Sequence, residues 1–221
     1  MGSFLKNQAS IIRLVLLLGL SSAICTAMLY VRNHYIQSGM FLWLIRPNLI
    51  LAWIPLIFAL GIHLLWQWRQ KVNVMMLILA VPWLLFLPNA PYIVTDIVHL
   101  TYIKENVPPQ LDVLMHVFTS FTGLFLGFVA LYLVHEIVAA SLNKLWGWLF
   151  ALFVQILCGI GVYFGRFLRW NSWDFFYAPQ QIIADLERVI NDWVAAAFVG
   201  GFSMFLICTY AVFVSCVRLR K

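Results

Sequence analysis

The sequence predicts an all-α protein that crosses a membrane about six times. Its composition is the first reason, because 64% of the residues are hydrophobic and only 10% are charged, whereas a soluble domain has about 25% charged residues. The second reason is that the apolar runs approach the roughly 20 residues that a spanning helix needs. Only short links separate them on one side. We therefore expect a single transmembrane domain over residues 1–221.

The first two spans are expected at residues 11–31 and 48–67. Lys6 and Arg13 precede the first apolar run, as they would in a signal peptide. This run is longer than a typical signal-peptide core and no small-x-small cleavage site ends it, which predicts a retained anchor. A short amphipathic helix is expected between these spans, from Tyr35 to Leu44.

The third span is expected at residues 73–88, where two prolines interrupt the chain. Pro88 and Pro91 each lack a backbone N–H and push the preceding residue toward extended geometry. We expect the span to end near Leu87 and the chain to turn at Asn89. Irregular backbone at membrane depth is tolerated only where protein or a wet cavity satisfies it.

The last three spans are expected at residues 111–139, 145–165 and 193–217. Between the fifth and sixth, Pro179 to Trp193 reads PQQIIADLERVINDW. Its apolar residues recur at helical spacing and its charged residues occupy most of the remaining surface. This pattern predicts an amphipathic helix that lies flat on the bilayer.

Small residues predict close contacts between helices. Gly123 and Gly127 form one GxxxG pair, Gly161 and Gly165 form another, and Gly200–Gly201 follows an alanine run in the last span. Packing within the chain is favoured over homodimerisation, because six helices must first pack on one another.

The charged residues predict the orientation. Counted alternately by side, eight Lys and Arg residues lie on the side of both termini and six on the other, while seven of the eight acids lie on that other side. The basic bias places both termini in the cytoplasm. The net charge of +6 is therefore a topology signal that favours contact with anionic headgroups, and it does not indicate nucleic-acid binding.

Two polar clusters are expected to meet at the outer membrane surface. The first follows the broken third span, in FLPNAPYIVTDIVHL, where Thr95 can cap a short helix and Asp96 and His99 share its face. The second is GRFLRWNSWD, from Gly165 to Asp174, at the end of the outward-running fifth span. Together they predict a polar pocket for a ligand, formed by the following residues: Asn89, Tyr92, Thr95, Asp96, His99, Arg166, Arg169, Asn171 and Asp174.

The segments LPNAPYIVTDIVHL and GRFLRWNSWD resemble the two signature blocks of a bacterial membrane family known as domain of unknown function 1361. The resemblance extends over most of the chain. It implies a multi-pass protein of the bacterial inner membrane, and it implies no particular activity.

Several chemistries compete at the polar pocket. Salt bridges between Arg166 and Arg169 and the acids Asp96 and Asp174 are the favoured alternative, because partly buried charges need partners. An anion site is next, since two arginines on one helical face can grip a phosphate or carboxylate, such as a phospholipid or isoprenoid-phosphate headgroup. Metal binding by Asp96, His99, His116 and Asp174 is less favoured, and neither a metal nor another cofactor is expected.

Two other polar groups carry weaker signals. Ser120 lies four residues after His116, which is only a faint indication of serine catalysis. His135 and Glu136 point about 100° apart on a helix, so one is expected to pack inward and the other to meet Lys144 or lipid headgroups.

Three functional classes remain open. The favoured one is a binding or accessory subunit, with membrane lipids, anionic headgroups and other membrane subunits as partners. A membrane-embedded enzyme that processes lipids or lipid carriers, including a metal-dependent hydrolase, is the second. A small transporter is the third. The sequence does not decide whether the protein is an enzyme.

Overall fold

The computed structural model describes residues 8–36, 40–102 and 109–219, and it describes side chains over residues 8–34, 47–100 and 110–219. In these ranges the chain forms helices joined by short turns. Six helical segments are long and apolar enough to cross a membrane. The chain is therefore an all-α polytopic membrane protein, as its composition predicts.

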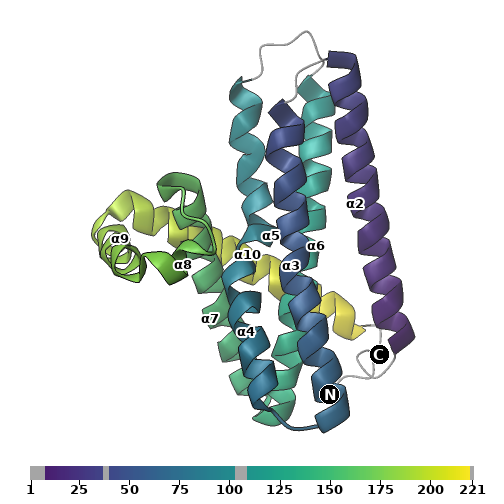
Figure 1. Ribbon diagram of the computed structural model, residues 1–221, viewed down its shortest axis with the longest axis vertical. Coiled ribbons are helices and arrows are strands. Elements are labelled where there is room, and N and C mark those ends of the chain that lie inside the picture. The colour runs from purple at the N-terminus through teal and green to yellow at the C-terminus, as the bar shows by residue number, and fades with distance from the viewer. Residues whose placement is uncertain (1–7, 37–39, 103–108, 220–221) are drawn as a thin grey trace.

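The spanning segments run up and down along one bundle (Figure 1). α2 (Gln8–Ile36) leads away from the end that holds the termini, and α3 (Met40–Arg69) returns to it. α4 (Val74–Phe86), the one-turn helix α5 (Asn89–Tyr92) and the 3₁₀ helix η1 (Ile93–Tyr102) together make the third crossing. The end opposite Gln8 and Leu219 is called the far end below.

The second half of the chain completes the bundle and adds a projection. α6 (Pro109–Ser141) returns from the far end, and α7 (Lys144–Tyr163) with the π-helical turn η2 (Phe164–Leu168) leads back toward it. α8 (Asp174–Tyr177) and α9 (Pro179–Asn191) project sideways partway along the bundle (Figure 1). α10 (Trp193–Leu219) then returns to the end that holds the termini.

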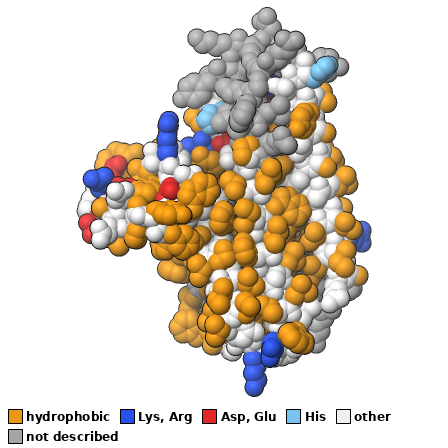
Figure 2. Space-filling view, in the orientation of Figure 1, with side chains coloured by type: hydrophobic (Ala, Val, Ile, Leu, Met, Phe, Trp, Pro, Cys, Tyr) orange, Lys and Arg blue, Asp and Glu red, His pale blue; other side chains and the backbone are white. Residues whose placement is uncertain are grey.

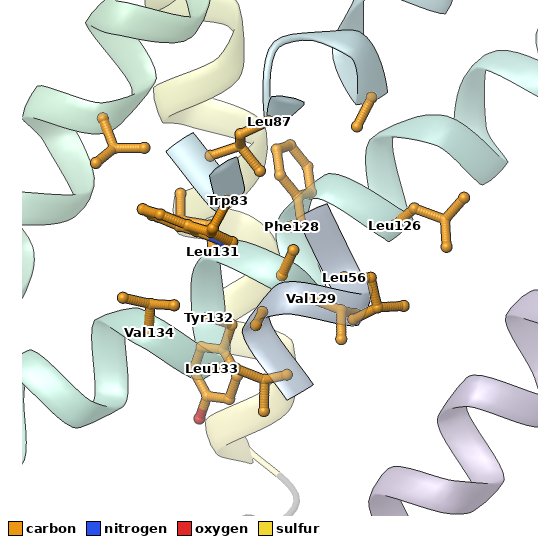
Figure 3. Packing of buried hydrophobic residues seen from close by; sticks show 14 of the residues in the cluster. Leu56, Trp83, Leu87, Leu126, Phe128, Val129, Leu131, Tyr132, Leu133 and Val134 are labelled. Carbon is orange, nitrogen blue, oxygen red and sulfur yellow. The ribbon is translucent and has the colours of Figure 1, made fainter. Parts of the chain in front are cut away.

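The central helix is α6. In its most apolar stretch 78% of the residues are buried, against 17% in that of α2. It packs against α2, α3, α7 and the α5–η1 segment. Figure 3 shows Phe128, Leu131 and Val134 of this helix among Trp83 and Leu87 from the third crossing.

The expected amphipathic helix before the last span is present as α9. Ile182, Leu186 and Val189 pack toward Phe164 of η2 and the start of α10, while Ile183 and Ile190 are exposed. The other expected helix, from Tyr35 to Leu44, is divided between the end of α2 and the start of α3. Residues 37–39 within it lie outside the described residues.

Candidate functional site

α4 ends beside the two prolines as predicted, but the expectation that Pro88 holds the preceding residue in extended geometry is wrong, because Leu87 has helical angles of φ −57° and ψ −38° and the crossing continues to Leu100. α4 ends at Phe86, and the chain makes the single turn of α5 before it continues as η1. The backbone of the break is satisfied locally, because Tyr92 N donates to Pro88 O at 3.0 Å and Ala90 N donates to Leu87 O at 3.2 Å. The expectation that Thr95 caps a helix is wrong. Thr95 lies inside η1, where its hydroxyl donates to Tyr92 O at 2.7 Å.

The two GxxxG pairs, one on α6 and one on α7 and η2, pack closely against the α5–η1 segment and its preceding proline. A Cβ on Gly161 would lie 2.6 Å from Cγ of Pro88, and a Cβ on Gly123 would lie 2.7 Å from the carbonyl oxygen of Ala90. Gly127 faces Ala90, and Gly165 faces the ring of Tyr92. Both GxxxG motifs therefore serve packing within the chain, as the sequence favours.

Gly200 and Gly201 differ from those pairs. A Cβ on either would meet nothing within 4 Å, so the expectation that this pair lets backbones approach is wrong for the contacts within the described chain. Both residues lie on the exposed side of α10, which packs mainly on α7 and α9.

Asp96 and Arg166 form the centre of the polar site. Asp96 is only 3% exposed, and its Oδ1 accepts a hydrogen bond from Nη2 of Arg166. Its Oδ2 accepts from Nδ2 of Asn48 on α3 at 2.8 Å. The two distant polar clusters therefore do meet, and both carboxylate oxygens of Asp96 have partners within the protein.

Arg166 is held by several groups of the α5–η1 segment. Its Nε and Nη2 donate to the Thr95 hydroxyl at 2.9 and 2.7 Å, and its Nη1 lies 3.1 Å from Nε2 of His99. Its Cζ lies over the ring of Tyr92, 4.3 Å from the centroid. Since a guanidinium has five N–H donors, these contacts and the Asp96 bond engage four of them. The predicted salt bridge is confirmed for this pair.

Arg169 takes no part in that arrangement. The turn η2 is closed by Trp170 N donating to Phe164 O at 3.1 Å, and Arg169 adopts left-handed backbone angles, φ 59° and ψ 30°. Its side chain is exposed and makes no hydrogen bond or ion pair to the described residues. The expectation that Arg166 and Arg169 share one helical face is wrong, because the wide turn and the left-handed residue separate them.

The remaining predicted residues, Asn89, Asn171 and Asp174, make hydrogen bonds that hold the neighbouring segments in place. Nδ2 of Asn89 donates to Oγ of Ser172 at 3.0 Å, which ties α5 to the segment after η2. Asp174 accepts from the backbone N–H of Asn171 at 2.7 Å and from its Nδ2 at 3.2 Å. Asp174 therefore makes a turn with Asn171, and its predicted ion pair with an arginine is absent from the described contacts.

The candidate metal ligands do not form a metal-binding group. Nε2 of His99 lies 3.8 Å from Oδ1 of Asp96, while the buried His116 instead bonds to Oγ of Ser120 through Nε2, at 3.3 Å. Over the described ranges no three His, Cys, Asp or Glu side chains gather in a way that would hold a metal ion.

Sequence reasoning missed three long-range polar contacts. Asn48 holds Asp96 from α3, and Arg32 forms a fully buried ion pair with Asp112, with Nε 3.1 Å from Oδ1. His135 and Glu136 are both buried, and Glu136 accepts from Nη2 of Arg218 at 3.1 Å, so the expectation that one of the two meets Lys144 or lipid headgroups is wrong. Only the polarity of Asn48 at the start of its span signalled the first, because the partners are 48 to 82 residues apart in sequence.

The site lies where η1 and η2 meet, beside the α8–α9 projection, and this place is called the corner below. Figure 2 shows basic, acidic and His side chains together between the α8–α9 projection and the far part of the bundle, next to atoms that are not described. Five aromatic side chains on and around the projection are 50–84% exposed, and they are Phe167, Phe175, Phe176, Tyr177 and Trp193. The corner is thus bordered by an aromatic surface of the kind that anchors proteins at a bilayer interface.

Comparison with known proteins places the chain in a family without assigning it a chemistry. No curated protein and no solved structure matches it. One family model, described as "Protein of unknown function (DUF1361)", matches residues 47–210, which include both polar clusters. The chain therefore belongs to this family of proteins of unknown function.

Proposed function

We propose that this protein is a binding protein of the bacterial inner membrane, and that it holds an anionic group of the phosphate or carboxylate class partway along its bundle, toward the far end. The bacterial location is supported by the family resemblance. The orientation is supported by the basic residues on the side of the termini, which make the far end the outer face. The anion would bind in the corner beside the α8–α9 projection.

One observation carries the proposal: Arg169 presents a guanidinium that pairs with no described residue, close to the Asp96–Arg166 ion pair. Asp96 neutralises Arg166, whereas Arg169 and Asp174 each lack an ion-pair partner among the described residues. A guanidinium that is exposed on one side can grip a phosphate through two parallel N–H bonds. Arg166 retains a single N–H for the same ligand.

An exposed arginine is commonly a solvated surface residue. The backbone conformation of Arg169 supports a binding role instead. Helices that end in a left-handed residue usually place Gly there, and another L-residue costs roughly 1–2 kcal/mol. Arg169 stands at φ 59° despite this cost. Residues held in such conformations cluster at ligand-binding positions.

The test uses Arg169→Gly, which removes the guanidinium and suits the left-handed backbone. The purified full-length protein is titrated with pyrophosphate and with phosphatidic acid, and binding is followed by tryptophan fluorescence. Loss of charge-assisted bonds worth about 1.5–3 kcal/mol should weaken binding by at least about tenfold. Arg188→Gln is the matched control, because the Arg188 side chain is 81% exposed and pairs with Asp185 on α9.

Two results would refute the proposal. One is that neither probe binds the wild-type protein. The other is that Arg169→Gly binds as tightly as wild type. A stability measurement on the same variant separates a binding defect from misfolding, since Arg169→Gly should be as stable as wild type or more so.

A second role, as a subunit of a membrane complex, is favoured by α10. Gly200 and Gly201 present backbone to the outside of the bundle, and a Cβ at either position would have nothing within 4 Å. Such surfaces allow another helix to approach closely. Purification from native membranes in a mild detergent tests this role. A partner should co-purify with wild type and be lost from Gly200→Leu, and recovery of the wild-type chain alone would argue against it.

A further inference from the structure

We infer that the anion bound at this corner is carried on a hydrocarbon chain, so that the ligand is an amphiphile with a phosphate headgroup lying in the outer surface of the membrane. This inference rests on the proposed anion site and names the class of its ligand. The observation behind it is that the charged residues of the corner alternate with exposed apolar residues.

The two segments that build the corner have the same pattern. In η1, Ile97 and Val98 stand between Asp96 and His99, and in η2, Phe167 and Leu168 stand between Arg166 and Arg169. The four apolar side chains are exposed by the following fractions: Ile97 52%, Val98 41%, Phe167 54% and Leu168 38%. The charged residues Asp96 and Arg166 meanwhile turn inward to each other. Arg169 is therefore directly preceded in the chain by two exposed apolar residues, Phe167 and Leu168.

The height of the corner fits a ligand in the membrane surface. The segment Lys144–Leu168 has 25 residues, which at about 1.5 Å per residue is enough to cross the hydrocarbon layer and end at its boundary. The exposed aromatic residues Tyr177 and Trp193 lie at the end of α8 and at the start of α10, on either side of α9. Tyr and Trp side chains prefer the headgroup level of a bilayer, so Arg169 would lie at the depth of lipid phosphates.

A ligand with a hydrocarbon chain would contact both the charged and the apolar surface of the corner, whereas a soluble anion would contact only the charged surface. The phosphate would pair with Arg169 while the first part of its chain lies over Phe167 and Leu168. Arg side chains at this depth favour anionic headgroups over zwitterionic ones, because the latter carry their own compensating cation. The expected ligands are therefore phosphatidic acid-like or polyprenyl-phosphate-like amphiphiles.

The experiment measures which phosphate the protein gathers from a bilayer. The full-length protein is reconstituted into phosphatidylcholine vesicles that contain a small fraction of pyrene-labelled phosphatidic acid, and energy transfer from tryptophan to pyrene is recorded. Pyrene-labelled phosphatidylcholine at the same fraction gives the background. Glycerol 3-phosphate and inorganic phosphate are added as soluble competitors. Transfer should exceed the background for the phosphatidic acid probe and fall to it in Arg169→Gly.

The apolar contribution is tested with Ile97→Ser, which leaves every charge in place. The variant should bind the phosphatidic acid probe more weakly by about threefold to tenfold, while its affinity for soluble glycerol 3-phosphate stays unchanged. Ile57→Ser is the matched control, because Ile57 is 60% exposed on α3 away from the corner. If Ile97→Ser does not fold, Leu168→Ser replaces it.

The outcomes separate this inference from the proposed function. Energy transfer above background that millimolar soluble phosphate fails to abolish supports the inference. Equal affinity for glycerol 3-phosphate and the lipid probe would overturn it and leave an anion site for soluble ligands. If no phosphate of either kind binds, both the inference and the proposed function fail.

Discussion

The contact between Gly161 and Pro88 gives the sharpest test of how the site is positioned. In Gly161→Ala the new Cβ would lie 2.6 Å from Cγ and 2.8 Å from Cβ of the proline ring. Carbon atoms at ordinary contact are about 3.5–4.0 Å apart, so the helices must separate by about 1 Å. The ring cannot rotate away, and the backbone of α5 or α7 must therefore move.

The expected loss is about 0–2.5 kcal/mol in the free energy of unfolding, with the middle of this range at about 1 kcal/mol. Overpacking of this kind costs about 1–3 kcal/mol, and replacing Gly by Ala within a helix returns about 0.5–1 kcal/mol. Because Pro88 precedes Asn89, the displacement should also weaken the bond from Asn89 to Ser172, which is 3.0 Å long. Anion binding at the corner should weaken with it.

The assay is unfolding in mixed dodecyl maltoside and sodium dodecyl sulfate micelles, followed by circular dichroism. Gly200→Ala is the matched control, because its Cβ would meet nothing within 4 Å and the change should be neutral or stabilising. The reasoning about the broken crossing is refuted if Gly161→Ala unfolds at the same sodium dodecyl sulfate fraction as Gly200→Ala.

Three further predictions concern polar contacts. Asp112→Asn removes the negative charge that faces the buried Arg32 and should destabilise the protein by about 3–5 kcal/mol; normal accumulation and stability of the variant would contradict this. Tyr210→Phe removes the partner of Nδ1 of His135, 2.9 Å away in a fully buried setting, and should cost about 1–3 kcal/mol in the same unfolding assay, so a neutral effect would count against the contact. Arg188→Gln breaks an exposed pair on α9 and should change stability by less than about 1 kcal/mol; a larger loss would mean that α9 is held differently.

The sequence predicts the crossings well because their signal is local. Each apolar run is continuous, and Pro88 and Pro91 predict the end of α4 to within a residue or two, although the third crossing itself continues beyond them to Leu100. The meeting of Asp96 and Arg166 follows from the same reasoning, since both lie at the end of an outward-running span. Topology alone places such residues at one depth.

The partners across the bundle could not be predicted for a physical reason. α2, α3 and α6 are apolar on all sides, so no amphipathic stripe shows which face of each helix turns toward which neighbour. The pairs Arg32–Asp112 and Glu136–Arg218 depend on those rotations. A charge in a loop and a charge buried just inside a helix end have the same appearance in such a sequence.

The different roles of Arg166 and Arg169 follow from the turn that separates them. On a regular α-helix, residues three apart lie on one face, and both guanidinium groups would then compete for the single carboxylate of Asp96. The π-helical turn widens the helix at η2, and the left-handed Arg169 redirects the chain. One arginine is thereby fixed to η1 as part of the structure, and the other stays exposed, with no described residue compensating its charge. A variant that restores regular helix here should therefore lose anion binding even though both arginines remain.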